Sequence, residues 1–196
     1  AYNIYNLLLV VSLSGFPTAI AKMVSERRAL NNYQGAYQVY KIARWGLFLI
    51  GLVSSAFVLL FARNLVTFLG FPGSYYSMLS LVPALFAVPL LSVYRGFFQG
   101  MQNMTPIALS QLIEQIFRVA VGLYLAYAFV DTGLEEAAAG ATFGASAGAI
   151  AALILIYTMF FLSKKNVKEE IILSKNNKTE PVQDVIRSLL YIALPI

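Results

Sequence analysis

The chain has 196 residues, of which 59% are hydrophobic and 12% are charged, and its formal net charge is +5 at pH 7. A soluble globular domain has about 25% charged residues, so this composition excludes an ordinary soluble domain. The chain contains no cysteine and no histidine, which excludes thiol nucleophiles, disulfides, thiolate metal sites and imidazole acid–base chemistry. Because the basic residues fall between apolar runs, we expect them to meet a membrane surface and not nucleic acid.

Apolar runs recur along the chain at the length of about 20 residues that a spanning helix needs. They predict an all-α, polytopic membrane helical bundle. A further apolar span begins near Val185 and is still running at residue 196. Because the chain also starts in an apolar run at Ala1, we expect it to be a fragment of a longer protein. The polar segment 163–184 predicts a linker, with a short interfacial helix near 167–173 as the alternative. The expected spans are about 4–24, 44–62 (able to extend back to Tyr37), 75–98, 107–130 and 137–162.

The first run contains Gly15 and Pro17 and ends near Lys22. Pro17 cannot donate the hydrogen bond that its position in a helix requires, so we expect a kink there. Kinked helices line substrate sites in transporters, although a kink that serves only helix packing is the alternative. Lys22 either points into a cavity or extends to the membrane interface.

The third run contains Pro83 and Pro89, with Arg95 near its end. The two prolines predict bends in this helix, and we group them with Gly15 and Pro17 as candidate kink or gating residues. Arg95 is a candidate contact for a phosphate group, and an ordinary anchor to lipid phosphates is the alternative.

The fourth run carries four polar residues on one helix face: Gln111, Glu114, Gln115 and Arg118. Ionisable groups at membrane depth are costly and tend to face a bundle interior or a wet cavity. We therefore expect this stripe to line a cavity, with Arg118 attracting an anionic substrate group and Glu114 tuning it or carrying a coupling ion. A structural ion pair with glutamines between helices is the alternative reading.

The fifth run repeats glycine every four residues, at Gly140, Gly144 and Gly148. This spacing is typical of close helix–helix contact, with a sliding interface as a second interpretation. Basic residues gather in every second segment between the runs, and this alternation orients the chain in a membrane. We expect segments 25–43, 99–106 and 163–184 on the cytoplasmic side of the membrane.

Three segments resemble the SpoVB/MurJ-type polysaccharide transporter family, in particular its Firmicutes branch with the YtgP-type lipid II flippases. They are GFPTAIAKMVSE over 15–26, RGFFQGMQNMTP over 95–106, and AAGATFG over 138–144. The resemblance implies the N-terminal lobe of a MATE-like (MOP superfamily) fold without its first helix. It also implies translocation of an undecaprenyl-pyrophosphate-linked sugar precursor, such as lipid II, by alternating access. Membrane lipids and the C-terminal lobe of the same protein would be its partners.

Three other functions remain open at this point. A MATE-type drug or cation antiporter would favour an acidic cavity, which Arg118, Lys22 and Arg95 oppose. A non-transporting membrane scaffold for envelope or spore assembly would not need ionisable groups on an inner helix face. A membrane glycosyltransferase would need a catalytic carboxylate loop, for which only the cluster Asp131, Glu135 and Glu136 is a candidate. We expect a transporter and not an enzyme, with no cofactor and no metal, because the sequence shows no catalytic or phosphate-cradling motif.

Overall fold

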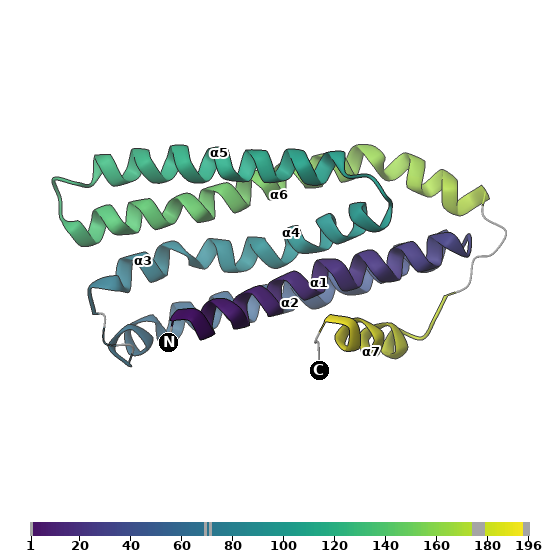
Figure 1. Ribbon diagram of the computed structural model, residues 1–196, viewed down its shortest axis with the longest axis horizontal. Coiled ribbons are helices and arrows are strands. Elements are labelled where there is room, and N and C mark those ends of the chain that lie inside the picture. Colours follow the sequence, from purple (N-terminus) through teal and green to yellow (C-terminus); the bar gives the residue numbers. More distant parts are fainter. Residues whose placement is uncertain (1, 69, 71, 174–178, 194–196) are drawn as a thin grey trace. The chain divides into compact units, whose positions relative to one another are not determined.

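The computed structural model describes residues 2–68, 70, 72–173 and 179–193. Within these residues it describes every side chain except those of 2–14, 72, 165–168 and 173. All regular structure in these residues is helical. The elements are α1 (Tyr2–Ala29), α2 (Tyr33–Phe68), the 3₁₀ helix η1 (Pro72–Ser74), α3 (Tyr75–Ser80), α4 (Val82–Gly100), α5 (Thr105–Ala128), α6 (Leu134–Leu173) and α7 (Val182–Ala193) (Figure 1).

Within the described residues, four helical stretches are long and apolar enough to cross a membrane. The first predicted span falls in α1, whose side chains are described from Gly15 onward. The prediction of an all-α polytopic membrane bundle is therefore confirmed. The four stretches are Tyr33–Phe68, Tyr75–Gly100, Thr105–Ala128 and Leu134–Lys164.

The helices extend well beyond the apolar runs that predicted them. Most of the expected loop 25–43 is helical, because α1 ends only at Ala29 and α2 begins at Tyr33. The expected linker 163–184 is also helical over its first part, since α6 continues to Leu173. Hydropathy marks the part of a helix that suits lipid, whereas backbone hydrogen bonds continue through polar residues beyond it.

The helices form two compact units. The first unit comprises Ala1–Leu47, Ser92–Ile107 and Ile156–Ile196, and the second comprises Phe48–Leu91 and Ala108–Leu155. Helices α2, α4, α5 and α6 thus contribute residues to both units.

The core of the first unit is a cluster of buried aromatic rings from α2, α4 and α6. Tyr40 is 1% exposed, and its ring centroid lies 4.7 Å from that of Phe160 and 5.0 Å from that of Phe97. Tyr94 adds a ring from α4 at 5.8 Å from Tyr40. Pairs at these separations contribute beyond the apolar area that they bury, so the cluster ties these three helices together.

Two glycines of α4 allow this helix to approach α1 closely. A Cβ added to Gly96 would lie 2.7 Å from the carbonyl oxygen of Pro17 and 2.9 Å from Cβ of Ile20. A Cβ on Gly100 would lie 2.6 Å from Cβ of Val24. A larger residue at either position therefore separates the two helices. Helix α1 itself runs through Pro17 without interruption.

Helices α1 and α4 end in the same way, although neither uses glycine. Asn31 has φ 55° and Gln102 has φ 59°, both in the left-handed region. The amide of Asn32 donates to the carbonyl of Arg27 at 2.8 Å, and that of Asn103 donates to Phe98 at 3.0 Å. This is the Schellman pattern. The Asn32 side chain then accepts the amide of Gly35 at 2.9 Å and caps the start of α2.

In the second unit, the glycine repeat of α6 packs against α5. A Cβ on Gly140 would lie 2.8 Å from the carbonyl carbon of Leu125, and one on Gly148 would lie 2.5 Å from the Glu114 carbonyl oxygen. A Cβ on Gly144 would meet the backbone of Arg118 and, at 2.7 Å, Cα of Gly122. The prediction that this repeat serves close helix packing is confirmed.

The third predicted span is divided at Leu81, between α3 and α4. Pro83 lies in the first turn of α4, where its missing amide proton is tolerated, and α4 continues through Pro89 without a break. The hydroxyl of Ser146 on α6 donates to the Ser80 carbonyl at 2.5 Å and accepts the amide of Ala84 at 3.2 Å. Ser146 therefore satisfies backbone groups on both sides of the break.

Candidate functional site

A cavity of about 410 Å³ lies between α1 and α7 in the first unit. Its walls are antiparallel, because Gly15 in the middle of α1 meets Ala193 at the end of α7, whereas Arg27 near the end of α1 pairs with Glu180 just before α7. Helix α7 lies along the C-terminal half of α1 (Figure 1). The lining residues are Lys22, Met23, Glu26 and Arg27 of α1 and Arg187, Ser188, Tyr191 and Ile192 of α7.

Among the charged residues that line this cavity, cations outnumber anions. Lys22, Arg27 and Arg187 contribute positive charge, and Glu26 is the acidic residue among the lining side chains. Lys22 and Glu26 are four residues apart and their charged atoms are 4.0 Å from each other, with both side chains more than half exposed. A pair of this kind is weak, so Lys22 is available to an anion that enters the cavity.

Close contacts hold α7 against α1 at both ends of the cavity. At one end, Gly15 meets the carbonyl group of Ala193, and a Cβ on Gly15 would clash with that carbonyl oxygen. Gly15, predicted as a kink residue, is thus the place where α7 touches the α1 backbone. At the other end, Glu180 precedes α7 and contacts both α1 and α2.

Glu180 is bound through its side chain and through its backbone. Its carboxylate lies 2.5 Å from Nη2 of Arg27, whose side chain is 11% exposed. The amide group of Gln38 donates to the Glu180 carbonyl at 2.7 Å and accepts the Glu180 amide at 3.1 Å. Arg27 Nη1 donates in addition to the Met23 carbonyl of its own helix at 3.0 Å. A charge-assisted pair and a two-point backbone contact therefore meet at one residue.

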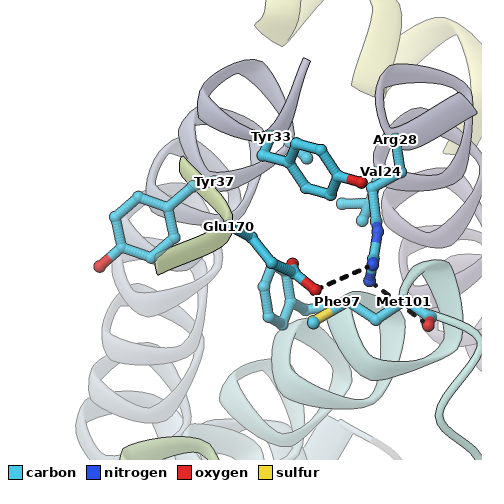
Figure 2. A pocket seen from close by; sticks show the side chains of 8 residues that line it. Val24, Arg28, Tyr33, Tyr37, Phe97, Met101 and Glu170 are labelled. Carbon is cyan, nitrogen blue, oxygen red and sulfur yellow. Dashed lines mark hydrogen bonds and ion pairs between the residues drawn. The ribbon is translucent and has the colours of Figure 1, made fainter. Parts of the chain in front are cut away.

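The next residue of α1, Arg28, contacts the C-terminal end of α6. Its Nη2 lies 3.4 Å from the Glu170 carboxylate, and its Nη1 lies 3.5 Å from the carbonyl of Met101 (Figure 2). The Tyr33 ring centroid is 5.4 Å from the guanidinium carbon, within the range of a cation–π contact. These groups line a pocket of about 10 Å³, large enough for one water molecule.

The second unit contains the predicted ion pair. Arg118 Nη2 lies 2.5 Å from Glu114 Oε1. Glu114 is buried, whereas the Arg118 side chain is 42% exposed, and Nε of Arg118 is buried without an acceptor among the described residues. Gln111 and Gln115 on the same helix are exposed. Of the predicted stripe, the structure thus brings Glu114 and Arg118 together against the glycine repeat of α6.

The remaining predicted site residues are distributed over both units. Lys22 and Arg95 belong to the first unit, and Arg118 belongs to the second. Lys22 lines the α1–α7 cavity, whereas Arg95 is half-buried on α4. Pro89 is buried, and Pro17 and Pro83 are half-buried.

Sequence reasoning did not single out Arg27, Gln38, Glu180 or Arg187 as site residues. Glu180 lies in the segment predicted as a linker, and its partners are more than 140 residues away in sequence. No periodicity marks such a pairing. Gly96 and Gly100 did carry a signal, because small residues spaced by four typify close helix contact.

The fold and these sites define a multi-pass helical membrane protein. The family model described as "Polysaccharide biosynthesis protein" matches residues 1–190, and the chain belongs to this family. It is 33% identical over 155 residues to stage V sporulation protein B of Bacillus subtilis (strain 168), covering 79% of this chain and 30% of that protein. It is 31% identical to the lipid II flippase MurJ of the same organism, covering 80% of this chain and 31% of that protein.

A third relative from the same organism is the uncharacterized membrane protein YabM. It is 31% identical over 199 residues, covering 100% of this chain and 36% of that protein. The chain therefore spans about a third of the length of these curated relatives. No solved structure matches the chain significantly.

Proposed function

We propose that the protein translocates a lipid-linked sugar pyrophosphate precursor across the bacterial cytoplasmic membrane by alternating access. The observation that carries this proposal is the cationic α1–α7 cavity in a member of the polysaccharide biosynthesis family. The relative named as a lipid II flippase supports a precursor of that class. The protein would act as a transporter and not as an enzyme. The chain described here would work together with the C-terminal lobe of the same protein.

The cavity suits a pyrophosphate head group on physical grounds. Guanidinium groups bind phosphate through two parallel hydrogen bonds, and an ammonium group adds a point charge. Arg187 and Lys22 supply one group of each kind from facing helices. A cavity for a hydrophobic cation would instead be lined with acidic residues, so the cationic lining favours an anionic substrate over a drug or cation antiporter.

The orientation proposed from the basic segments places this cavity towards the cytoplasmic end of the helices. Segments 25–43, 99–106 and 163–184 would face the cytoplasm. Lys22 and Arg187 could then meet the head group in the inner leaflet. Arg118, with its unpaired Nε, remains a separate candidate contact for the substrate.

Complementation tests this proposal in a strain depleted of its own lipid II flippase. The full-length protein should restore growth, whereas Lys22→Ala combined with Arg187→Ala should not, although the variant remains in the membrane. Labelling of precursor exposed on the outer leaflet should fall in parallel. Lys41→Ala is the matched control, because Lys41 is exposed on α2 and does not line the cavity.

Two outcomes would reject parts of the proposal. Failure of the unmodified protein to expose precursor on the outer leaflet would reject the flippase function and favour a scaffold. Normal growth of the Lys22→Ala, Arg187→Ala variant would instead remove the α1–α7 cavity from the transport path. Arg118→Ala, tested in the same strain, should abolish growth in either case. If Arg118 contacts the substrate, adding Glu114→Gln leaves growth lost, whereas if Arg118 only neutralises the buried Glu114, the double variant restores growth.

A further inference from the structure

We propose that Glu180 acts as a latch: its contacts hold α7 against α1, and α7 therefore remains one wall of the α1–α7 cavity. The inference deepens the proposed function, on which its consequence for transport rests. The contacts that define the latch are those of Glu180 with Arg27 and Gln38.

The geometry concentrates three contacts on the residue that leads into α7. The Gln38 side chain forms hydrogen bonds with both backbone polar groups of Glu180, which fixes the path of the chain there. Arg27 forms an ion pair with the Glu180 carboxylate. Two residues later, Val182 begins α7, so the position of Glu180 sets where this helix starts relative to α1.

The charges of the latch differ in exposure, and this difference makes the contact both strong and releasable. The Arg27 side chain is 11% exposed and the Glu180 side chain is 42% exposed. Loss of Glu180 leaves a buried guanidinium without its carboxylate, which is unfavourable. Water can still reach the carboxylate, so the pair can open without unfolding the helices around it.

Adjacent arginines hold both sides of the connection between α6 and α7. Arg28 pairs with Glu170 near the end of α6, and Arg27 pairs with Glu180 before α7. Glu170 and Glu180, which lie before and after this connection, are therefore each paired with the C-terminal turn of α1. When Glu180 is released, Glu170 still holds α6, so the resulting freedom belongs to α7.

Cross-linking across the cavity tests the latch without relying on transport. The chain has no cysteine, so Glu26→Cys and Ser188→Cys place one thiol on each wall of the cavity. The pair is introduced into the full-length protein in membranes, with any cysteine outside this chain replaced. The rate of coupling by a short bis-maleimide then reports how closely α7 is held against α1.

Glu180→Gln should lower this rate roughly tenfold, the loss expected when a hydrogen bond to a charged group is removed. Arg27→Glu should lower it as well, and combining Arg27→Glu with Glu180→Arg should restore it. Glu169→Gln is the control, because it removes the same charge from an exposed residue of α6, and it should leave the rate unchanged. A rate insensitive to Glu180→Gln, or a charge exchange without rescue, would overturn the latch.

Precursor labelling in the same membranes separates the two proposals. If cross-linking responds as expected but the unmodified protein exposes no precursor, the proposed function fails and the latch stands. If the unmodified protein exposes precursor but cross-linking ignores Glu180→Gln, the latch fails and the function stands.

Discussion

Arg118 lies one helical turn after Glu114 on α5 and reaches back to its carboxylate at 2.5 Å, although the two side chains are 42% and 12% exposed. The Glu114 carboxylate is thus enclosed beside α6, whereas the Arg118 guanidinium extends to the edge of the contact between α5 and α6. A buried carboxylate depends on its partner more than an exposed guanidinium does.

Removing the two partners should therefore have unequal effects. Arg118→Gln takes the guanidinium away from the buried Glu114 carboxylate and should lower the free energy of unfolding by about 2–3 kcal/mol. Adding Glu114→Gln to it should recover more than half of this loss, because the buried charge is gone. Thermal unfolding of the purified full-length protein in detergent, analysed as a double-mutant cycle, measures the coupling. A coupling indistinguishable from zero would show that the pair contributes nothing to stability.

The glycine contact between α5 and α6 predicts a strong response to a single methyl group. Gly144→Ala places a Cβ against the backbone of Arg118 and Gly122. Backbone atoms cannot rotate away as a side chain can, so α5 and α6 must move apart. The variant should therefore lose about 1–3 kcal/mol of stability. Gly46→Ala is the matched control, since a Cβ at Gly46 meets nothing within 4 Å, and it should gain about 0.5–1 kcal/mol. Equal unfolding temperatures for the two variants would contradict the close contact.

The left-handed end of α4 predicts a stabilising substitution. Gln102 has φ 59°, a conformation in which a side chain is unfavourable. Gln102→Gly should raise the free energy of unfolding by up to about 1 kcal/mol. Gln99→Gly, inside the same helix, should lower it by about 1 kcal/mol. Thermal unfolding in detergent compares the two, and a loss of stability in both would argue against the Schellman ending.

The break at Leu81 depends on Ser146. Ser146→Ala removes the partner of the Ser80 carbonyl and of the Ala84 amide, so we expect a loss of about 1–3 kcal/mol. Ser54→Ala is the control, since its hydroxyl donates to the Gly51 carbonyl of its own helix at 3.1 Å, and it should change stability little. Protease resistance near residue 81 measures the local effect. Unchanged resistance in Ser146→Ala would show that the break does not need the hydroxyl.

The sequence predicted the helices better than the connections between them. Length and hydropathy located the spans, because burial in lipid demands apolar residues and a fully bonded backbone. The ends were misplaced, since polar residues such as those beyond Leu162 continue α6 without changing its backbone hydrogen bonds. The break before Pro83 was anticipated only as a bend, because one proline is compatible with either outcome.

The candidate site was anticipated in part for a similar reason. Glu114 and Arg118 are four residues apart on one helix, so local geometry alone predicts that they can pair. Lys22 was identified as a cation near membrane depth, but its cavity depends on α7, which lies more than 160 residues later in the chain. Glu180 and Gln38 meet only through tertiary folding, and no local pattern in a single sequence encodes such a meeting.

The contact of Gly96 and Gly100 with α1 has a mechanical consequence. At Gly96 and Gly100 the α4 backbone packs directly on the Pro17 carbonyl and on the stiff, β-branched side chains of Ile20 and Val24, so α1 and this end of α4 must move as one piece. Any rearrangement of the first unit then has to be absorbed by neighbours joined through side chains. The hinge of such a movement would lie outside this pair, and α1 would serve as its fixed frame.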